Sequence, residues 1–218
     1  MSEKQEIFSL LGGKIKMHRG FYNPTSDAVW LAAFAPRKVK TALDVGIGSG
    51  GVSLCLIAHN PKLDIVGIDV SGDMLDLCAT NVKANKANIK LINADIFSWK
   101  TSETFDLVVS NPPYFKGTPA RHNAHHNIDL SEWIKKCVAR VKPRGYIVVI
   151  VDASVLSEVI SVINEHCGDI TILPLFGAKN VAERVLVRAR LGVKGGTVIC
   201  SGRSMNDTDV LRDGLTIQ

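Results

Sequence analysis

The chain has 218 residues, of which 46% are hydrophobic and 22% charged, and its formal net charge is +5 at pH 7. These values predict one globular domain with a full core, and the lack of any run of 18 apolar residues argues against a membrane span. The start of the chain lacks the layout of a signal peptide, and the five cysteines are scattered and never spaced C-x-x-C, so we expect a cytoplasmic protein with reduced thiols.

The first elements in chain order are a hairpin and a helix. F-S-L-L-G-G-K-I-K-M, residues 8–17, indicates two strands joined by a two-residue Gly-Gly turn. Thr25 or Ser26 can then cap a helix that Pro36 ends. Residues 1–40 are therefore expected to form a unit of their own at the start of the chain.

From residue 41 onward, β-branched runs alternate with helical patterns, which predicts a doubly wound parallel α/β sheet. The last two strands are joined by a short loop, so one strand should be antiparallel. The expected strands are residues 41–45, 64–70, 89–94, 105–110, 145–151, 169–175 and 184–191. The expected helices are residues 52–59, 71–85 with Ser71 as cap, a helix from Asp129 with Glu132 at capping-box spacing, and 153–166. We expect a core of residues 41–193 and a short tail of residues 194–218.

A glycine-rich turn, D-V-G-I-G-S-G-G, follows the first strand of the core. Gly46, Gly48 and Gly51 fit the pattern G-x-G-x-x-G, and Gly46, Gly48 and Gly50 fit G-x-G-x-G. Glycines at a strand-to-helix turn let backbone N–H groups approach a ligand closely. Asp69 ends the next strand, where its carboxylate can accept hydrogen bonds from both hydroxyls of a ribose. Both patterns suit any cofactor that contains a ribose.

Two further acids distinguish the cofactors. Asp44 lies on an apolar strand just before the glycines, where it would repel a pyrophosphate and suit a cationic or zwitterionic ligand. Asp95 ends the third strand and can pair with an adenine amine while Ile96 packs on the ring, and Val70 is a further candidate contact. S-adenosylmethionine, with its sulfonium, amino acid group, ribose and adenine, fits this set. The alternative is that the three aspartates are unrelated turn residues at strand ends.

The fourth strand runs into S-N-P-P-Y-F, a corner that two prolines make rigid. The side-chain oxygen of Asn111 and the carbonyl of Pro112, held still by Pro113, can accept the two N–H groups of a planar amine. Such acceptors would stabilise the positive charge that develops when the nitrogen takes a methyl group. Tyr114 can stack on a planar base, and neither a metal nor a general base is required. The alternative is a turn with exposed aromatics.

The motifs D-V-G-I-G-S-G, the acid Asp69, A-D-I-F and N-P-P-Y, in this order and spacing, resemble the class I S-adenosylmethionine-dependent methyltransferases of the amino-methylating branch. G-F-Y-N-P-T-S-D-A-V-W and A-E-R-V-L-V-R-A-R resemble more narrowly the bacterial tRNA1(Val) (adenine-37-N6)-methyltransferases. The resemblance implies a single-domain Rossmann-like fold with a mostly parallel, seven-stranded sheet in the order 3-2-1-4-5-7-6. It also implies that the N-terminal segment closes over the cofactor, with Tyr22, Thr25 and Asp27 as site residues.

Charge favours a nucleic acid as the substrate. Residues 1–40, 111–145 and 179–194 are basic and residues 41–110 are acidic, which suits a polyanionic partner, although solvated faces would explain each cluster alone. Together with the resemblance, this favours methylation of adenine N6 in tRNA. The corner also fits base amines of rRNA and the amide of protein glutamine. An RNA-binding protein without turnover and, more remotely, an NAD-dependent oxidoreductase stay open.

Three other groups of residues have either a structural or a functional interpretation. His122, His125 and His126 form H-x-x-H-H, which favours a loop that contacts phosphates or solvent over a metal site. The tryptophans at positions 30, 99 and 133 are expected to pack in the core. The arginines of the last strand indicate either a stripe that faces phosphates or a solvated edge that deters pairing; they are Arg184, Arg188 and Arg190.

Overall fold

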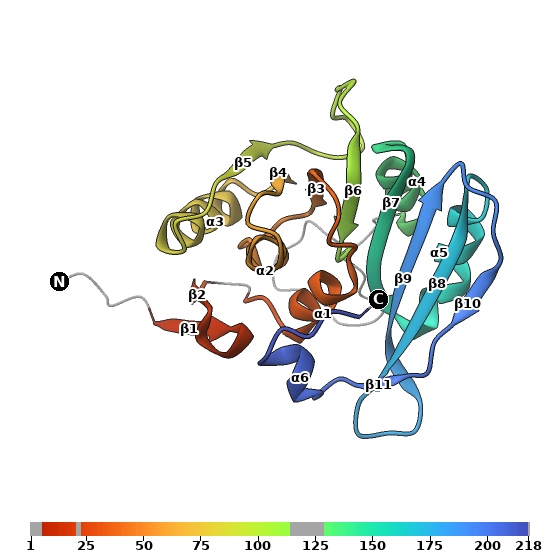
Figure 1. Ribbon diagram of the computed structural model, residues 1–218. Coiled ribbons are helices and arrows are strands. Elements are labelled where there is room, and N and C mark those ends of the chain that lie inside the picture. The colour runs from red at the N-terminus through yellow and green to blue at the C-terminus, as the bar shows by residue number, and fades with distance from the viewer. Residues whose placement is uncertain (1–5, 21–22, 114–128, 218) are drawn as a thin grey trace.

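The computed structural model describes residues 6–20, 23–113 and 129–217. Its main element is a nine-stranded sheet with the order β10-β8-β9-β7-β6-β3-β4-β5, and β11 also pairs with β8 (Figure 1). The strands are β3 (Thr41–Val45), β4 (Asp64–Asp69), β5 (Ile89–Asn93), β6 (Phe105–Ser110), β7 (Val141–Asp152), β8 (Cys167–Phe176), β9 (Ala182–Leu191), β10 (Thr197–Ile199) and β11 (Arg203–Ser204).

The strand order confirms the expected topology, although β10 and β11 bring the expected seven strands to nine. Numbered from the first core strand, β5-β4-β3-β6-β7-β9-β8 is the order 3-2-1-4-5-7-6. Within the described residues, β9 is antiparallel to both of its neighbours, and every other strand pair of this sheet is parallel. β7 begins at Val141, earlier than predicted, because the strand continues across Pro143 through a shift in register against β6.

Helices cover both faces of the sheet (Figure 1). One buried cluster joins the sheet to helices α1, α2, α3 and α6, and a second joins it to α4 and α5. Alternate residues of β6 serve the two faces, because Leu107 and Val109 belong to the first cluster and Val108 to the second. The helices are α1 (Ser26–Phe34), α2 (Gly51–His59), α3 (Gly72–Ala84), α4 (Leu130–Val138), α5 (Leu156–Ile163), which follows the 3-10 turn η2 (Ala153–Val155), and α6 (Thr208–Leu211). None of the described helices has an apolar stretch long enough to cross a membrane.

The predicted helix caps are confirmed. The Thr25 hydroxyl accepts a hydrogen bond from the backbone N–H of Asp27 at 3.3 Å, and the Ser71 hydroxyl accepts one from Met74. At the start of α4, the Asp129 carboxylate accepts the N–H of Glu132 at 3.0 Å. Each cap satisfies a donor that the first helical turn leaves without an internal partner.

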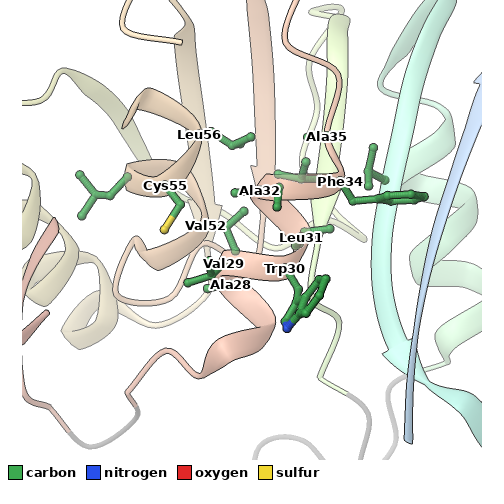
Figure 2. Packing of buried hydrophobic residues seen from close by; sticks show 14 of the residues in the cluster. Ala28, Val29, Trp30, Leu31, Ala32, Phe34, Ala35, Val52, Cys55 and Leu56 are labelled. Carbon is green, nitrogen blue, oxygen red and sulfur yellow. The ribbon is translucent and has the colours of Figure 1, made fainter. Parts of the chain in front are cut away.

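Helix α1 is buried on all sides. Every residue from Asp27 to Phe34 is buried, and Figure 2 shows side chains such as Val29 and Ala32 on the side of α2, with Phe34 pointing away toward the sheet. A helix that is apolar all round needs a cover on each side. The C-terminal segment supplies one, since the Trp30 indole N–H donates to the carbonyl of Met205 at 3.1 Å.

The N-terminal hairpin is present, but its predicted two-residue turn is wrong. Strands β1 (Ile7–Leu10) and β2 (Ile15–His18) are joined by the 3-10 turn η1 (Leu11–Gly13) and Lys14, and Leu10 pairs with Ile15. The turn widens because Leu11 packs its side chain into the core, with its φ angle at 50°. The glycines therefore follow the anchoring leucine instead of forming the turn alone.

Strand β2 is held on α3 by two asparagines. The Asn81 side-chain oxygen accepts the His18 backbone N–H at 2.8 Å, and its amide donates to the carbonyl of Ser49 at 2.9 Å. Asn85 accepts the N–H of Lys16 and donates to its carbonyl. Side-chain amides thus take the place of a neighbouring strand and dock the hairpin beside the glycine-rich turn.

Candidate active site

The register of the sheet brings the predicted site residues to one edge. Val45 at the end of β3 pairs with Ile68 of β4 on one side and with Ser110 of β6 on the other. The next residues along these three strands are Gly46, Asp69 and Asn111. Neighbouring strands lie about 4.8 Å apart, so these residues share the carboxyl edge of the sheet, where ligands bind in open α/β folds.

The glycine-rich turn needs glycine for two different reasons. Gly46, Gly48 and Gly50 have φ angles of 75°, 54° and 90°, in the left-handed region that other residues seldom adopt. Gly51 has an ordinary φ angle, but a Cβ there would lie 2.6 Å from the ring of Pro24. The first three glycines therefore shape the turn, and the fourth lets the segment before α1 approach it.

Asp69 supports the turn and keeps acceptor capacity. One carboxylate oxygen accepts the N–H of Gly48 and the other accepts the N–H of Ser71, both at 2.9 Å. Each oxygen has a second lone pair, so the carboxylate can still accept two hydroxyl groups. Val70 beside it is 55% exposed, and apolar surface of this extent at a strand end suits a ligand ring.

Asp44 is a buried acid with few partners. The side chain is 1% exposed, and one oxygen accepts the Ser53 hydroxyl at 2.7 Å. Burial raises the pKa of Asp44 to about 7, against the lowering effect of the Ser53 hydrogen bond. The carboxyl group therefore changes charge near neutral pH, immediately beneath the glycine-rich turn. The sequence did not point to Ser53, which lies in the first turn of α2.

Beyond β5, Asp95 is exposed and accepts the N–H of Phe97 at 2.9 Å. Ile96 is 3% exposed and belongs to the buried cluster under α4, so its side chain faces the core. Phe97 is 36% exposed and presents an aromatic ring at this edge. Its ring packs edge-on against the ring of Trp133, with 5.8 Å between the ring centroids. Phe97 was missed in the sequence because Ile96 follows the acid directly.

The Asn-Pro-Pro corner directly follows β6. Asn111 and Pro113 are partly exposed, and Pro112 is buried. Ser110, just before the corner, is fully buried; its hydroxyl donates to the Val45 carbonyl at 2.8 Å and accepts the Trp133 indole N–H at 3.0 Å. The corner is thus anchored from below. Tyr114 and Tyr22 lie outside the described residues, so their predicted roles remain predictions.

Asp27 and Arg184 connect α1 to the sheet. Asp27 is buried at the start of α1 and accepts the Arg184 Nε–H at 3.2 Å, while Asp152 at the end of β7 accepts from the same guanidinium at 3.1 Å. Arg188 lies over the ring of Phe34 and donates to its carbonyl. The solvated-edge interpretation of these arginines is wrong, because β9 pairs on both sides.

The described residues contain no group of three or more His, Cys, Asp or Glu side chains that could hold a metal ion. The three histidines of the H-x-x-H-H stretch lie outside the described residues. Trp30 and Trp133 are buried, as predicted, and Trp99 is partly buried against the guanidinium of Arg140.

A sheet of this strand order, with a glycine-rich turn after its first core strand and an acid after the next, defines the class I methyltransferase fold, whose cofactor is S-adenosylmethionine. The chain belongs to the methyltransferase small domain family, whose model matches residues 25–174. This match covers the glycine-rich turn, the strand-end aspartates and the corner.

Relatives differ in what their names say they methylate. The chain is 28% identical over 131 residues to a tRNA1(Val) (adenine(37)-N6)-methyltransferase of Glaesserella parasuis, covering 56% of each protein. It is 37% identical over 86 residues to a ribosomal protein uL3 glutamine methyltransferase of Xanthomonas campestris, covering 39% of the chain and 27% of that protein. Among solved structures, the 16S rRNA N2 G1207 methyltransferase of T. thermophilus, in complex with AdoMet and guanosine, has a TM-score of 0.62 at 18% identity and covers 85% of this chain and 50% of that one. The chain thus spans about half or less of these proteins.

The site fits S-adenosylmethionine on the evidence of its own geometry. Asp69 keeps an acceptor lone pair on each oxygen, beside the exposed side chain of Val70. Asp44 is a buried acid with one hydrogen-bond donor among the described side chains, which suits a cationic ligand better than a diphosphate. An NAD-type cofactor would require its pyrophosphate next to this carboxylate.

Proposed function

We propose that this protein transfers a methyl group from S-adenosylmethionine to an exocyclic, planar amine, and that the amine is adenine N6 in tRNA. The observation that carries the proposal is the register of β3 and β6. The pairing of Val45 with Ser110 sets the Asn-Pro-Pro corner directly beside the glycine-rich turn. Two acceptors for an amine thus adjoin the turn expected to bind the methyl donor.

The residues of the turn would hold the cofactor. Asp69 would accept from the ribose hydroxyls, Asp95 from the adenine amine, and Asp44 would balance the positive charge, while Val70 and Phe97 supply apolar contact. Thr25, and Tyr22 outside the described residues, would close the site from the N-terminal segment. Once bound, S-adenosylmethionine supplies a methyl group on a positively charged sulfur.

The corner would act on the amine. An amine conjugated with a ring is a poor nucleophile because its lone pair is delocalised. The Asn111 side-chain oxygen and the Pro112 carbonyl would accept its two N–H groups and stabilise the charge that develops on nitrogen. Proline fixes the backbone at the corner, so the carbonyl needs no reorganisation during the reaction. The nitrogen loses its proton after the transfer, so no general base is needed.

The distribution of charge supports RNA as the substrate. The basic segments flank an acidic middle that carries the cofactor residues, which favours a polyanion beside the site. Coverage of the relatives does not separate the substrates, because the tRNA1(Val) adenine-methylating relative is matched along 56% of its length and a putative protein N5-glutamine methyltransferase of Methanocaldococcus jannaschii along 54%. A protein glutamine amide is the second candidate, favoured by that second relative, because an amide is also a planar amine that two acceptors can hold.

The decisive experiment offers both substrates. The protein is incubated with methyl-labelled S-adenosylmethionine and either unmodified total tRNA or a ribosomal protein extract, and the modified nucleoside or residue is identified by mass spectrometry. We expect N6-methyladenosine in tRNA. Label in glutamine or in cytidine alone would contradict the adenine assignment. Tight tRNA binding with no transfer to any substrate would instead support a binding protein without turnover.

A calorimetric titration tests the cofactor separately. S-adenosylhomocysteine, the product of the proposed reaction, should bind, and NADH should not. Binding of NADH alone would contradict the assignment of the glycine-rich turn to S-adenosylmethionine.

A further inference from the structure

A buried chain of hydrogen bonds links α4 to the two turns of the site. The Trp133 indole N–H donates to the Ser110 hydroxyl at 3.0 Å, and that hydroxyl donates to the Val45 carbonyl at 2.8 Å. An indole nitrogen can only donate, so the serine must use its own hydrogen on the carbonyl. The direction of both bonds is therefore fixed, and both lie away from water, since Ser110 is 0% and Trp133 8% exposed.

These hydrogen bonds lie where the backbone pairing between β3 and β6 ends. Val45 and Ser110 are the last paired residues of β3 and β6, so the backbone ladder between these strands stops with them. The following residues are Gly46 and Asn111, the first residues of the two functional turns. A side-chain bond between the strands at this level continues the restraint that the ladder no longer provides.

The indole ring also contacts the other turns of the site. A Cβ on Gly46 would lie 3.5 Å from Cζ2 of Trp133, so the ring packs against the glycine-rich turn. The edge-on contact with Phe97 reaches the turn after β5. Trp133 thus touches the turns after β3 and β5 directly, and it reaches the corner after β6 through Ser110.

The helix that carries Trp133 is firmly held. Leu130, Ile134, Cys137 and Val138 of α4 are all buried in the cluster beneath the sheet. The indole is therefore a fixed support and does not depend on the cofactor for its place. Its polar contact is directed at the corner, which is where the reacting amine would be held.

We infer that Trp133 is a positioning residue that acts through Ser110 to set the distance between the acceptor corner and the methyl donor. The inference rests on the proposed function and adds a determinant of rate that does not touch the substrate. Because a misplacement of about 1 Å can slow a reaction roughly 100-fold, the loss of this restraint should affect transfer more than binding.

The test is a double-mutant cycle of Trp133→Phe, Ser110→Ala and the double variant. Each is assayed for single-turnover methyl transfer to unmodified tRNA, for the Kd of S-adenosylhomocysteine by calorimetry, and for its thermal unfolding midpoint. We expect either single change to slow transfer about 10- to 100-fold while Kd changes less than about threefold. The double variant should be no slower than the slower single variant, because both changes remove the same restraint.

Trp99→Phe is the matched control. The Trp99 ring contacts the guanidinium of Arg140, whose carbonyl accepts the N–H of Phe105 at the amino end of β6, so loss of this indole should leave the transfer rate within about twofold. Ser110→Ala keeps the inference testable should Trp133→Phe fold poorly. An unchanged rate in both single variants would overturn the inference. So would a loss of S-adenosylhomocysteine affinity equal to the loss of rate, or effects that multiply in the double variant.

The outcomes separate this inference from the proposed function. A wild-type protein that methylates glutamine and not tRNA contradicts the proposed substrate, and the same cycle, run on that substrate, then decides the role of Trp133. A wild-type protein that methylates nothing and binds no S-adenosylhomocysteine overturns both. Normal methylation of tRNA by both single variants overturns the positioning role alone.

Discussion

The two edges of the sheet use aspartate in opposite ways. At the amino edge, Asp106 at the start of β6 accepts the backbone N–H groups of Lys40 and Thr41, both at 3.0 Å, and the Lys142 ammonium at 2.9 Å. Burial would raise the pKa of Asp106, but these hydrogen bonds outweigh it and lower that pKa. At the carboxyl edge, Asp44 on the neighbouring strand is buried with one hydroxyl partner, and burial raises its pKa to about 7.

We propose that the difference separates a structural group, Asp106, from a group that binds the cofactor, Asp44. Asp106 has a proton donor for each of its oxygens and braces three segments of the chain. Burial of Asp44 outweighs its hydrogen bonding to Ser53 and raises its pKa, so the ionised carboxylate costs folding free energy. Asp44 and Asp69, which both keep acceptor capacity, lie on neighbouring strands at the carboxyl edge, which also carries the corner. Three changes test this contrast and a fourth concerns a partly buried histidine, in order of decreasing expected effect.

The largest effect is expected from Asn111→Ala at the carboxyl edge. Losing one fixed acceptor should lower kcat about 10²- to 10³-fold while the Kd of S-adenosylhomocysteine changes little. Asn88→Ala, an exposed asparagine at the amino edge, is the control and should leave both values unchanged. An equal loss of cofactor affinity in Asn111→Ala would show that Asn111 has a structural role instead.

Asp44→Asn should weaken cofactor binding and strengthen the fold. The amide still accepts from Ser53 but cannot balance a cation, so affinity for S-adenosylmethionine at pH 8 should fall roughly 10- to 100-fold. In the wild type, affinity should rise with pH and level off above about 7, as Asp44 ionises, and the variant should be flat. Calorimetry across this pH range tests both, with the exposed Asp73→Asn as control.

The stability of the same variant has a defined sign. Because the folded pKa of Asp44 is raised from 3.8 to about 7, its contribution to stability is complete below pH 3.8 and is lost as pH rises through 7. At pH 8, the free energy of unfolding of Asp44→Asn, measured by denaturant titration, should therefore exceed that of the wild type by about 1–3 kcal/mol. This gain should vanish near pH 4. A destabilised variant at pH 8 would show that the charge is compensated in the fold.

At the amino edge, Asp106→Ala should destabilise the fold and leave methyl transfer unchanged. Removing the shared acceptor of Lys40 and Thr41 should lower the free energy of unfolding by about 1–3 kcal/mol. Methyl transfer by the folded protein should remain at the wild-type rate. The wild-type contribution is present above pH 3.8 and is lost as pH falls through the lowered pKa, so the two proteins should converge in acid. Asp64→Asn, exposed at the same edge, should change stability by less than about 0.5 kcal/mol.

The smallest effect is expected from His59→Gln at the end of α2. Burial and the nearby charge of Arg37 lower the pKa of His59, so its contribution is present above pH 6.5 and is lost as pH falls. Wild-type stability should thus decline more steeply than that of the variant between pH 7 and 5 in denaturant titrations. His166→Gln, an exposed histidine, should not alter the slope. Parallel slopes for the wild type and His59→Gln would contradict this role.

Local patterns predicted most of the fold. Thr25, Ser71 and Asp129 cap helices as expected because a cap depends on residues within one turn. The strand order was available only through the resemblance, since alternation alone does not order strands. The short strands β10 and β11 escaped prediction because two or three residues form no pattern, and their pairing to β8 depends on the rest of the sheet.

The positions of the candidate-site residues were predictable where motifs are contiguous. Gly46, Asp69 and Asn111 lie at the ends of three strands that are adjacent in the parallel sheet, which brings them together. Ser110 and Trp133 were not recognised because their bond joins a strand to a distant helix and serves no local turn. Side chains that support the site from below leave no spacing signature, because their contacts arise only in the folded protein.

The burial of helix α1 makes the timing of synthesis a factor in folding. The helix is made early, but its indole at Trp30 finds its carbonyl partner 175 residues later, and the N–H of Ile217 donates to the carbonyl of Ala33. A nascent chain that has released the whole parallel sheet from the ribosome still exposes one side of this apolar helix. The cover of helix α1 is therefore complete only once the C-terminal segment has been synthesised.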